Sequence, residues 1–364
     1  MIPASDPIDR VTAEVYRVPT DQPEADGTAE WDATTVVVVR VAAGEIEGLG
    51  YSYADASAAL VVTKVLAPLV RGACASDLPY LRDAMDRAVR NLGRAGVVAC
   101  AISAVDVALW DLRARLVRMP LLELLGRARA AAPVYGSGGF TTYDDDTTAA
   151  QLREWLELGV GAAKIKIGES AGAAEARDLQ RVALAREVLG DVELFVDANG
   201  GYTPSQARRV ERDLRDFDVR WFEEPVSSDY PAELAAVRAG AAMDIAAGEY
   251  CWGIQDAARL LAAGAVDCLQ LDVTRCGGFT GWLEGAALAE ASGISISAHC
   301  APQLSAHAVC AVRRARHLEY FHDHARIEPL LFDGALEVRE GSIEPAGTPG
   351  LGLTLGPRAE QFRV

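Results

Sequence analysis

The stretch that decides the fold is Gly159-Val160-Gly161-Ala162-Ala163-Lys164-Ile165-Lys166-Ile167-Gly168. Alternating residue types bounded by glycine are typical of a β-strand. Because successive side chains of a strand point to opposite faces, Lys164 and Lys166 lie on the same face. Neighbouring ammonium groups depress each other's pKa, and a lysine with a lowered pKa can accept a proton. A lone Lys-x-Lys would more often be a solvent-exposed strand face, so the choice rests on the rest of the chain.

The chain beyond residue 127 repeats a strand-and-helix pattern. Amphipathic helical stretches such as 148–158 and 204–216 separate short apolar, β-branched runs. The eight runs lie near residues 133–137, 162–167, 193–197, 219–223, 244–248, 267–271, 294–298 and 317–321. This alternation predicts a (β/α)8-type (TIM) barrel over residues 127–328. The last strand is expected to lack a full following helix, which gives a (β/α)7β barrel.

The N-terminal part predicts a different organisation, with strands first and helices after them. Strands are expected at 9–18, 34–42 and 48–53, with a polar loop at 21–28. Helices are expected at 56–71, 78–92 and 97–117, and a short one at 120–126. This order indicates an α+β capping domain over residues 1–126. Residues 329–364, rich in Gly and Pro, are expected to return to that domain.

Composition limits the partners of this 364-residue chain. Its 35 basic and 52 acidic residues give a formal charge of −17, a poor match to nucleic acid or an anionic membrane surface. No apolar run approaches the roughly 18 residues of a membrane span, and residues 1–10 show no secretory signal. Seven scattered cysteines without a Cys-x-x-Cys pair predict reduced thiols. We therefore expect a cytoplasmic protein with neither nucleic acid nor membrane as a partner.

Three successive strands of the predicted barrel end in a carboxylate: Asp197, Glu223 and Glu249. Chemistry in such barrels occurs at the C-terminal ends of the strands, where these side chains converge. One acidic residue at a strand end would more often be a helix N-cap. Three in register would repel one another unless a cation lay among them, and oxygen ligands favour a hard ion, Mg²⁺.

The following strands end in Asp272, His299 and Glu319. Asp272 and His299 lie one β/α unit apart, so they are expected to be neighbours that form an acid/base pair. On its own, His299 would more often be a structural or N-capping histidine. Together with Lys166 and a metal ion, these groups suit removal of the proton next to a carboxylate, because the enolate needs charge stabilisation.

These residues resemble the enolase superfamily, and within it the mandelate racemase branch of the mandelate racemase/muconate lactonizing enzyme family. The resemblance covers essentially the whole chain. The motifs that carry it are Lys164-Ile165-Lys166, Asp197-Ala198-Asn199, Glu223-Glu224-Pro225, Gly248-Glu249, Asp272-Val273-Thr274-Arg275-Cys276-Gly277-Gly278 and His299-Cys300-Ala301-Pro302.

The resemblance implies a role for each of these positions. Lys166 and the His299–Asp272 pair would be acid/base groups on opposite faces of the substrate. Lys164 would face the substrate carboxylate and lower the pKa of Lys166, and Glu319 would donate a hydrogen bond to the enolate oxygen. The remaining roles are Mg²⁺ binding by Asp197, Glu223 and Glu249, with Asn199 as a nearby substrate contact.

The resemblance also implies that segments 20–33 and 50–54 cover the barrel mouth. Candidate substrate contacts are Trp31, Tyr51, Tyr53, Tyr135 and Ser137, each of which could equally be a packing residue. Asn91 and Arg94 are weaker candidates that could instead serve a subunit contact. His322 and His324 could form a second metal site, although a histidine-rich turn at the barrel rim is the preferred interpretation.

Four reactions fit an enolate between two bases: racemisation, epimerisation, dehydration and cycloisomerisation. A polar cover with Tyr, Ser and Thr residues favours a polyhydroxylated acid. We expect dehydration of an aldonic or aldaric acid to a 2-keto-3-deoxy acid, with racemisation, epimerisation or cycloisomerisation as alternatives. A non-catalytic carboxylate-binding barrel would be expected to have lost site residues, and none is lost here. The family resemblance further suggests a homo-oligomer, from dimer to octamer.

Overall fold

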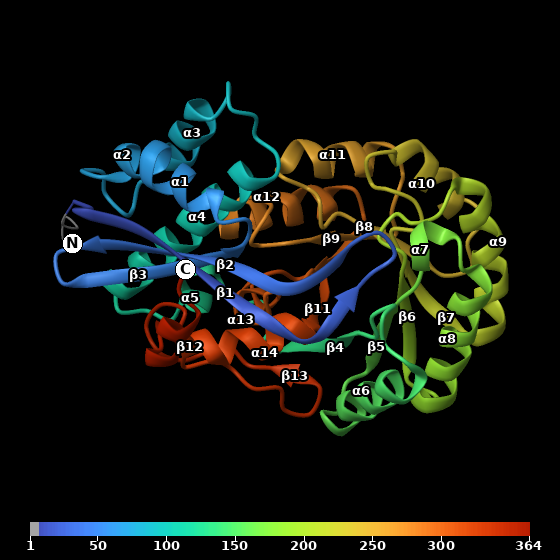
Figure 1. Cartoon of the computed structure of the whole chain (residues 1–364). Helices are drawn as coiled ribbons and strands as arrows, with labels where there is room; N and C mark the ends of the chain where they lie inside the picture. The colour runs from blue at the N-terminus through green and yellow to red at the C-terminus, as the bar shows by residue number, and fades with distance from the viewer. Residues whose placement is uncertain (1–6) are drawn as a thin grey trace.

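The computed structural model describes residues 7–364, which form a capping region beside a barrel (Figure 1). Residues 1–6, part of the stretch in which no export signal was expected, lie outside the described residues. Among the helices of residues 7–364, none is both long and apolar enough to cross a bilayer.

The capping sheet consists of three antiparallel strands, β1 (Arg10–Ala25), β2 (Glu30–Ala43) and β3 (Ile46–Tyr53). Both faces of β2 are buried. Val37 and Val39 belong to the core shared with the capping helices, whereas Val36 and Val38 belong to the core shared with the barrel. Burial on two faces explains why the sequence has a continuous valine run here instead of an alternation.

The β1–β2 hairpin is longer than the sequence predicted. Residues 21–28 were expected to form a loop, but β1 continues to Ala25 and β2 begins at Glu30. The pairing register shifts between Pro19 and Glu24, so the intervening residues bulge from β1 while pairing resumes beyond them. The hairpin therefore extends from the capping sheet across the barrel (Figure 1).

The predicted helices of the capping region are confirmed, with one subdivision. The segment expected at 56–71 is split by a π-helical turn. Ala104 and Ala108 of the long helix lie directly against β3, because a Cβ at Gly50 or Gly48 would lie 2.3 Å from their carbonyl oxygens. The helical elements are α1 (Ser57–Val61), η1 (Val62–Leu66), α2 (Ala67–Val70), α3 (Leu78–Ala88), α4 (Val97–Leu116) and α5 (Leu121–Leu125).

Eight parallel strands form a barrel that closes by pairing of the last strand with the first. They match the eight predicted runs: β4 (Ala132–Gly138), β5 (Ala162–Lys166), β6 (Glu193–Asp197), β7 (Val219–Glu223), β8 (Asp244–Ala247), β9 (Cys268–Leu271), β10 (Ser295–Ala298) and β11 (Ala315–Phe321). The helices between them are α6 (Asp145–Glu157), α7 (Glu169–Gly172), α8 (Glu175–Leu189), α9 (Pro204–Leu214) with η2 (Arg215–Phe217), α10 (Pro231–Arg238), α11 (Ile254–Ala262), α12 (Gly278–Ala291) and α13 (Pro302–Cys310).

One expectation for the end of the barrel was wrong. A ten-residue helix, α14 (His322–Leu331), follows β11 directly, although no full helix was expected there. Pro329 lies inside this helix, and an internal proline removes a backbone donor and weakens the helical pattern of the sequence. The tail contains β12 (Phe332–Asp333), β13 (Ser342–Ile343), β14 (Thr354–Leu355) and η3 (Pro357–Phe362), and Arg363 forms a bridge to Tyr16 of β1.

Candidate active site

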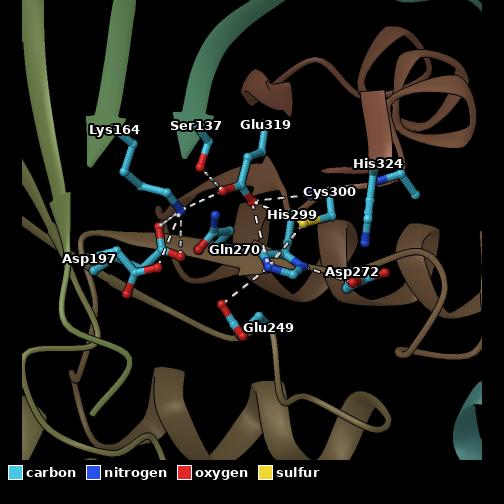
Figure 2. Close-up of polar contacts among 12 residues, drawn as sticks. Ser137, Lys164, Asp197, Glu249, Gln270, Asp272, His299, Cys300, Glu319 and His324 are labelled. Carbon is cyan, nitrogen blue, oxygen red and sulfur yellow. Dashed lines mark hydrogen bonds and ion pairs between the residues drawn. The ribbon is translucent and has the colours of Figure 1, made fainter. Parts of the chain in front are cut away.

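Both lysines of β5 point toward carboxylates at the ends of neighbouring strands. Lys166 Nζ lies 2.5 Å from Asp197 Oδ2. Lys164 Nζ lies 2.7 Å from Glu223 Oε2 and 2.8 Å from Glu319 Oε1, and all three side chains are fully buried (Figure 2). The predicted placement of both lysines on one face is therefore confirmed.

The expected lowering of the Lys166 pKa does not fit the structure. Burial and the ammonium of Lys164 do act to lower it, but the Asp197 carboxylate outweighs them and holds the pKa of Lys166 above its usual range. The pKa of Lys164 is raised in the same way: burial opposes the charge, and Glu223 and Glu319 stabilise it. Two neighbouring lysines alone would lower each other's pKa, but each ammonium also contacts a buried carboxylate, and that contact has the larger effect.

Asp197, Glu223 and Glu249 converge as the sequence predicted. Each contributes a carboxylate oxygen, and these oxygens lie within 4.8 Å of one another. Burial and the nearby Asp197 raise the pKa of Glu223 even though Lys164 is in contact with it. Glu249 Oε2 accepts no hydrogen bond, and His299 Nε2 lies 3.3 Å from it. Three buried carboxylates that converge in this way fit a hard divalent ion such as Mg²⁺.

His299 and Asp272 form the predicted pair. His299 Nδ1 lies 2.7 Å from Asp272 Oδ2, and Asp272 Oδ1 accepts hydrogen bonds from the backbone and side chain of Thr274. Burial would raise the pKa of Asp272, but these hydrogen bonds and the Arg275 charge hold it below its usual value. The Asp272 carboxylate fixes the imidazole through Nδ1, and Nε2 then faces Glu249 Oε2 at 3.3 Å and Glu319 Oε2 at 3.6 Å.

Glu319 contacts groups that donate to it, which differs from the expectation. Ser137 Oγ donates to Oε1 at 2.5 Å, and the Cys300 backbone N–H donates to Oε2 at 3.2 Å. Burial would raise the pKa of Glu319, but Lys164, His299 and Lys166 hold it below its usual range. An ionised carboxylate accepts and does not donate hydrogen bonds, so the expected donor role requires a proton that these neighbours disfavour.

A cavity of about 340 Å³ lies above these groups. Its barrel side includes Lys166, Glu249 and His299, and its capping side comes from β2 and the end of β3. At the tip of the β1–β2 hairpin, a Cβ on Gly27 would lie 2.6 Å from the carbonyl oxygen of Ala198, so the hairpin packs tightly on the barrel rim. The segments expected to cover the barrel mouth therefore do so.

The predicted substrate contacts divide into two groups. Trp31, Tyr53 and Asn199 line the cavity. Tyr51, Tyr135, Ser137 and Lys164 are fully buried and are not part of its wall. The Tyr51 hydroxyl donates to Glu328, and the Tyr135 hydroxyl accepts from Gln270. The expectation of direct substrate contact does not fit these four, because each side chain is used to hold a buried neighbour.

The four weaker candidates from the sequence, Asn91, Arg94, His322 and His324, do not lie together. Asn91 is exposed, and Arg94 lines a different cavity between the capping helices and the β8–α11 loop. His324 lines the site cavity, its ring stacked on Tyr53 with centroids 3.3 Å apart. His322 instead faces Asp21, with Nε2 3.0 Å from Oδ2.

Sequence reasoning missed Arg275 and Cys300. Arg275 lines the cavity. Its guanidinium lies 3.3 Å from a Glu249 oxygen and 3.4 Å from an Asp272 oxygen, so it connects the three convergent carboxylates with the Asp272–His299 pair. Cys300 Sγ lies 3.3 Å from His299 Nε2. Both belong to quoted motifs, at positions just after Asp272 and His299, and that adjacency was the available signal.

Comparison with known proteins agrees with this geometry. Residues 147–359 match the family model described as "Enolase C-terminal domain-like". Residues 10–126 match "Mandelate racemase / muconate lactonizing enzyme, N-terminal domain". The chain belongs to this family. It is an enolase-superfamily enzyme, a lyase or an isomerase.

Two curated relatives have named activities. A 3,6-anhydro-alpha-L-galactonate cycloisomerase from Streptomyces coelicolor is 32% identical over 96% of this chain and 97% of its own length. An L-talarate/galactarate dehydratase from Salmonella typhimurium is 32% identical over 87% of this chain and 79% of its own length.

Two solved structures have the same fold. A mandelate racemase/muconate lactonizing enzyme-like protein from Rubrobacter xylanophilus has a TM-score of 0.94 and 46% identity, covering 98% of this chain and 100% of the other. A racemase from Streptomyces coelicolor A3(2) with bound magnesium has a TM-score of 0.93 and 31% identity, covering 98% and 100%.

Proposed function

We propose that the enzyme catalyses Mg²⁺-dependent dehydration of an acid sugar to a 2-keto-3-deoxy acid. The observation that carries the proposal is one cavity with Lys166 and His299 in its wall and the three metal-type carboxylates beside them. A relative that dehydrates talarate and galactarate supports the substrate class. Intact site residues argue against a non-catalytic barrel.

In this mechanism Lys166 accepts the proton from the carbon next to the substrate carboxylate. Asp197, Glu223 and Glu249 would hold the Mg²⁺, which would supply stabilisation for the negative charge that develops on that carboxylate. With Asp197 serving as a metal ligand, Lys166 would lose the contact that raises its pKa and would be neutral before it accepts the proton. His299, protonated at Nε2 and held by Asp272, donates its proton to the β-hydroxyl as the C–O bond breaks. Water leaves, and the resulting enol rearranges to the keto acid.

His324 adds a hydrogen-bond donor to the cavity. Its Nδ1 accepts from the Ala301 backbone N–H at 3.2 Å, and burial holds its pKa well below the usual value, so the neutral ring carries its proton on Nε2. A neutral N–H next to His299 suits a substrate oxygen beyond the α-carbon. Trp31 closes the same cavity from the capping side.

Cycloisomerisation is the second candidate, because a relative that matches 96% of the chain is a cycloisomerase. Both reactions begin with removal of the α-proton and differ in the oxygen that leaves. In dehydration a hydroxyl leaves as water, whereas in cycloisomerisation of an anhydro acid the ring oxygen leaves and the molecular formula is unchanged.

A substrate screen in D₂O tests the proposal. Mono- and diacid sugars, lactones and anhydro sugar acids are incubated with enzyme and Mg²⁺, and products are followed by a keto-acid assay and proton NMR. A 2-keto-3-deoxy product with loss of water supports dehydration. A product of unchanged formula, or deuterium at the α-carbon without keto acid, contradicts it in favour of an isomerase.

Three variants set the controls for this screen. Lys166→Ala and His299→Asn should be inactive, and Asp32→Asn, an exposed carboxylate on the β1–β2 hairpin paired with Arg17, should retain activity. EDTA should abolish turnover by the wild-type protein. Turnover that persists in EDTA would contradict the metal assignment.

A further inference from the structure

A second cluster of metal-ligand side chains lies outside the catalytic cavity, where the β1–β2 hairpin meets the end of the barrel. It consists of Asp21 and Glu24 on β1 and His322, the first residue of α14. One ligand atom from each lies within 4.8 Å of the other two. The cluster therefore joins two parts of the chain that are about three hundred residues apart.

Unpaired polar atoms mark this place as incomplete. Glu24 is 1% exposed; its Oε2 accepts from Trp31 Nε1 at 2.7 Å, and its Oε1 has no hydrogen-bond partner. Tyr143 is 4% exposed, and its hydroxyl also lacks a partner. Tyr143 belongs to the buried aromatic cluster against which Trp31 packs, and Trp31 is the hydrogen-bond partner of Glu24. An unpaired buried oxygen is costly unless a ligand occupies the space that it faces.

The charge around the cluster is unbalanced. A third carboxylate, Asp323, follows His322 in α14 and acts on Glu24 together with Asp21. Arg326 also acts on Glu24; its Nη2 is paired with Asp323 at 2.6 Å, and its Nε has no hydrogen-bond partner. A divalent cation would balance the excess negative charge and accept the unpaired Glu24 oxygen.

We infer that Asp21, Glu24 and His322 bind a divalent transition-metal ion that fastens the β1–β2 hairpin to the barrel. One imidazole nitrogen and two carboxylate oxygens suit Zn²⁺, Co²⁺ or Mn²⁺, in contrast to the all-oxygen cluster of Asp197, Glu223 and Glu249. The site would be structural, because none of its three residues lines the catalytic cavity.

The metal would act on the cavity through Glu24. This carboxylate holds the indole of Trp31, which lines the cavity, and Trp31 packs edge-on against Phe140 at 5.5 Å. Fixing Glu24 to His322 would fix the roof of the cavity relative to its barrel wall. The inference is independent of which acid the enzyme uses.

Cobalt provides the test because Co²⁺ shifts the proton NMR signals of an imidazole that ligates it. Full-length protein containing Mg²⁺ is titrated with CoCl₂, and stoichiometry is measured by equilibrium dialysis. We expect a shifted, exchangeable imidazole N–H signal in the wild-type protein. That signal should disappear in His322→Ala, weaken in Glu24→Gln and persist in Glu249→Gln. A signal from His299, whose Nε2 lies 3.3 Å from Glu249 Oε2, should behave in the opposite way: it should persist in His322→Ala and weaken in Glu249→Gln.

Asp21→Asn is a second test variant in case His322→Ala or Glu24→Gln fails to fold. The Asp21 side chain is 42% exposed, so its substitution should leave folding intact. Co²⁺ should raise the thermal midpoint of the wild-type protein and of the control Asp32→Asn, but less that of Asp21→Asn. Two results would overturn the inference: no shifted imidazole signal in the wild-type protein, or the same signal in His322→Ala. In either case Glu24 would be a protonated acid near water.

Discussion

Lys164 balances the charge of buried carboxylates, so its replacement by methionine should strongly destabilise the metal-free protein. The ammonium lies 2.7 Å from Glu223, 2.8 Å from Glu319 and 3.6 Å from Asp197, and none of the four side chains is exposed. Methionine keeps most of the length and removes the charge. Breaking a buried ion pair by removing one partner costs about 3–5 kcal/mol, and we expect Lys164→Met to lie in that range in EDTA.

Urea unfolding in EDTA measures this cost through the midpoint and slope of the transition. Lys64→Met is the matched control, because Lys64 is exposed in the π-helical turn and should change the free energy of unfolding by no more than about 0.5 kcal/mol. Adding Glu319→Gln to Lys164→Met removes one of the uncompensated charges and should recover part of the loss. Mg²⁺ should also recover part of it, because Asp197 and Glu223 are proposed ligands.

The result that would refute this reasoning is a Lys164→Met protein within about 1 kcal/mol of wild type in EDTA. The carboxylates would then be protonated without the lysine, and the charge balance inferred from the contacts would be wrong. An equal loss in EDTA and in excess Mg²⁺ would instead remove Glu223 and Asp197 from the proposed ligand set.

Three further predictions concern the acid/base groups, the cavity and the buried network. Lys166→Ala and His299→Asn should each lower kcat by about 10²–10⁴-fold or more in the substrate assay, and full activity in either would contradict the two-base mechanism. His324→Phe should raise KM roughly 2- to 10-fold with a smaller effect on kcat, as expected for one lost hydrogen bond to substrate; an unchanged KM would contradict it. Burial raises the pKa of Glu328 to about 8, so its contribution to stability is present below pH 4.5 and is lost as the pH rises through 8. Glu328→Gln should therefore flatten the fall in thermal midpoint between those pH values, and an unchanged pH profile would contradict the assignment.

The barrel was predictable from sequence because each β/α unit carries its own local signal. All eight expected strands are present, and Lys166, the three convergent carboxylates, Asp272 and His299 lie at or just beyond the ends of the strands predicted to present them. Glu319 lies two residues before the end of β11. Spacing by one unit was enough to bring Asp197, Glu223 and Glu249 together and to pair Asp272 with His299.

The burial of each side chain and the identity of its hydrogen-bond partners could not be predicted from the sequence. Tyr51 and Tyr53 are two residues apart on β3 and share Glu328 as a partner, yet only Tyr53 lines the cavity. Lys164 and Lys166 share a face of β5. Lys166, two residues nearer the C-terminal end of the strand, lines the cavity, whereas Lys164 is fully buried beneath it. These differences depend on long-range packing between α14, β3 and the strand ends, which no local pattern encodes.

The choice between dehydration and cycloisomerisation must come from the capping side and the end of the barrel. In the proposed mechanism, removal of the α-proton by Lys166 beside the carboxylate cluster is common to both reactions, and His299 acts on the oxygen that leaves. What differs is the position of the leaving oxygen relative to His299 Nε2. That position depends on the groups that hold the rest of the substrate, and the cavity residues that we propose for this role are Trp31 on β2, Tyr53 on β3 and His324 on α14. Substitutions there should change the preferred substrate while leaving α-proton exchange intact, whereas Lys166→Ala should abolish both.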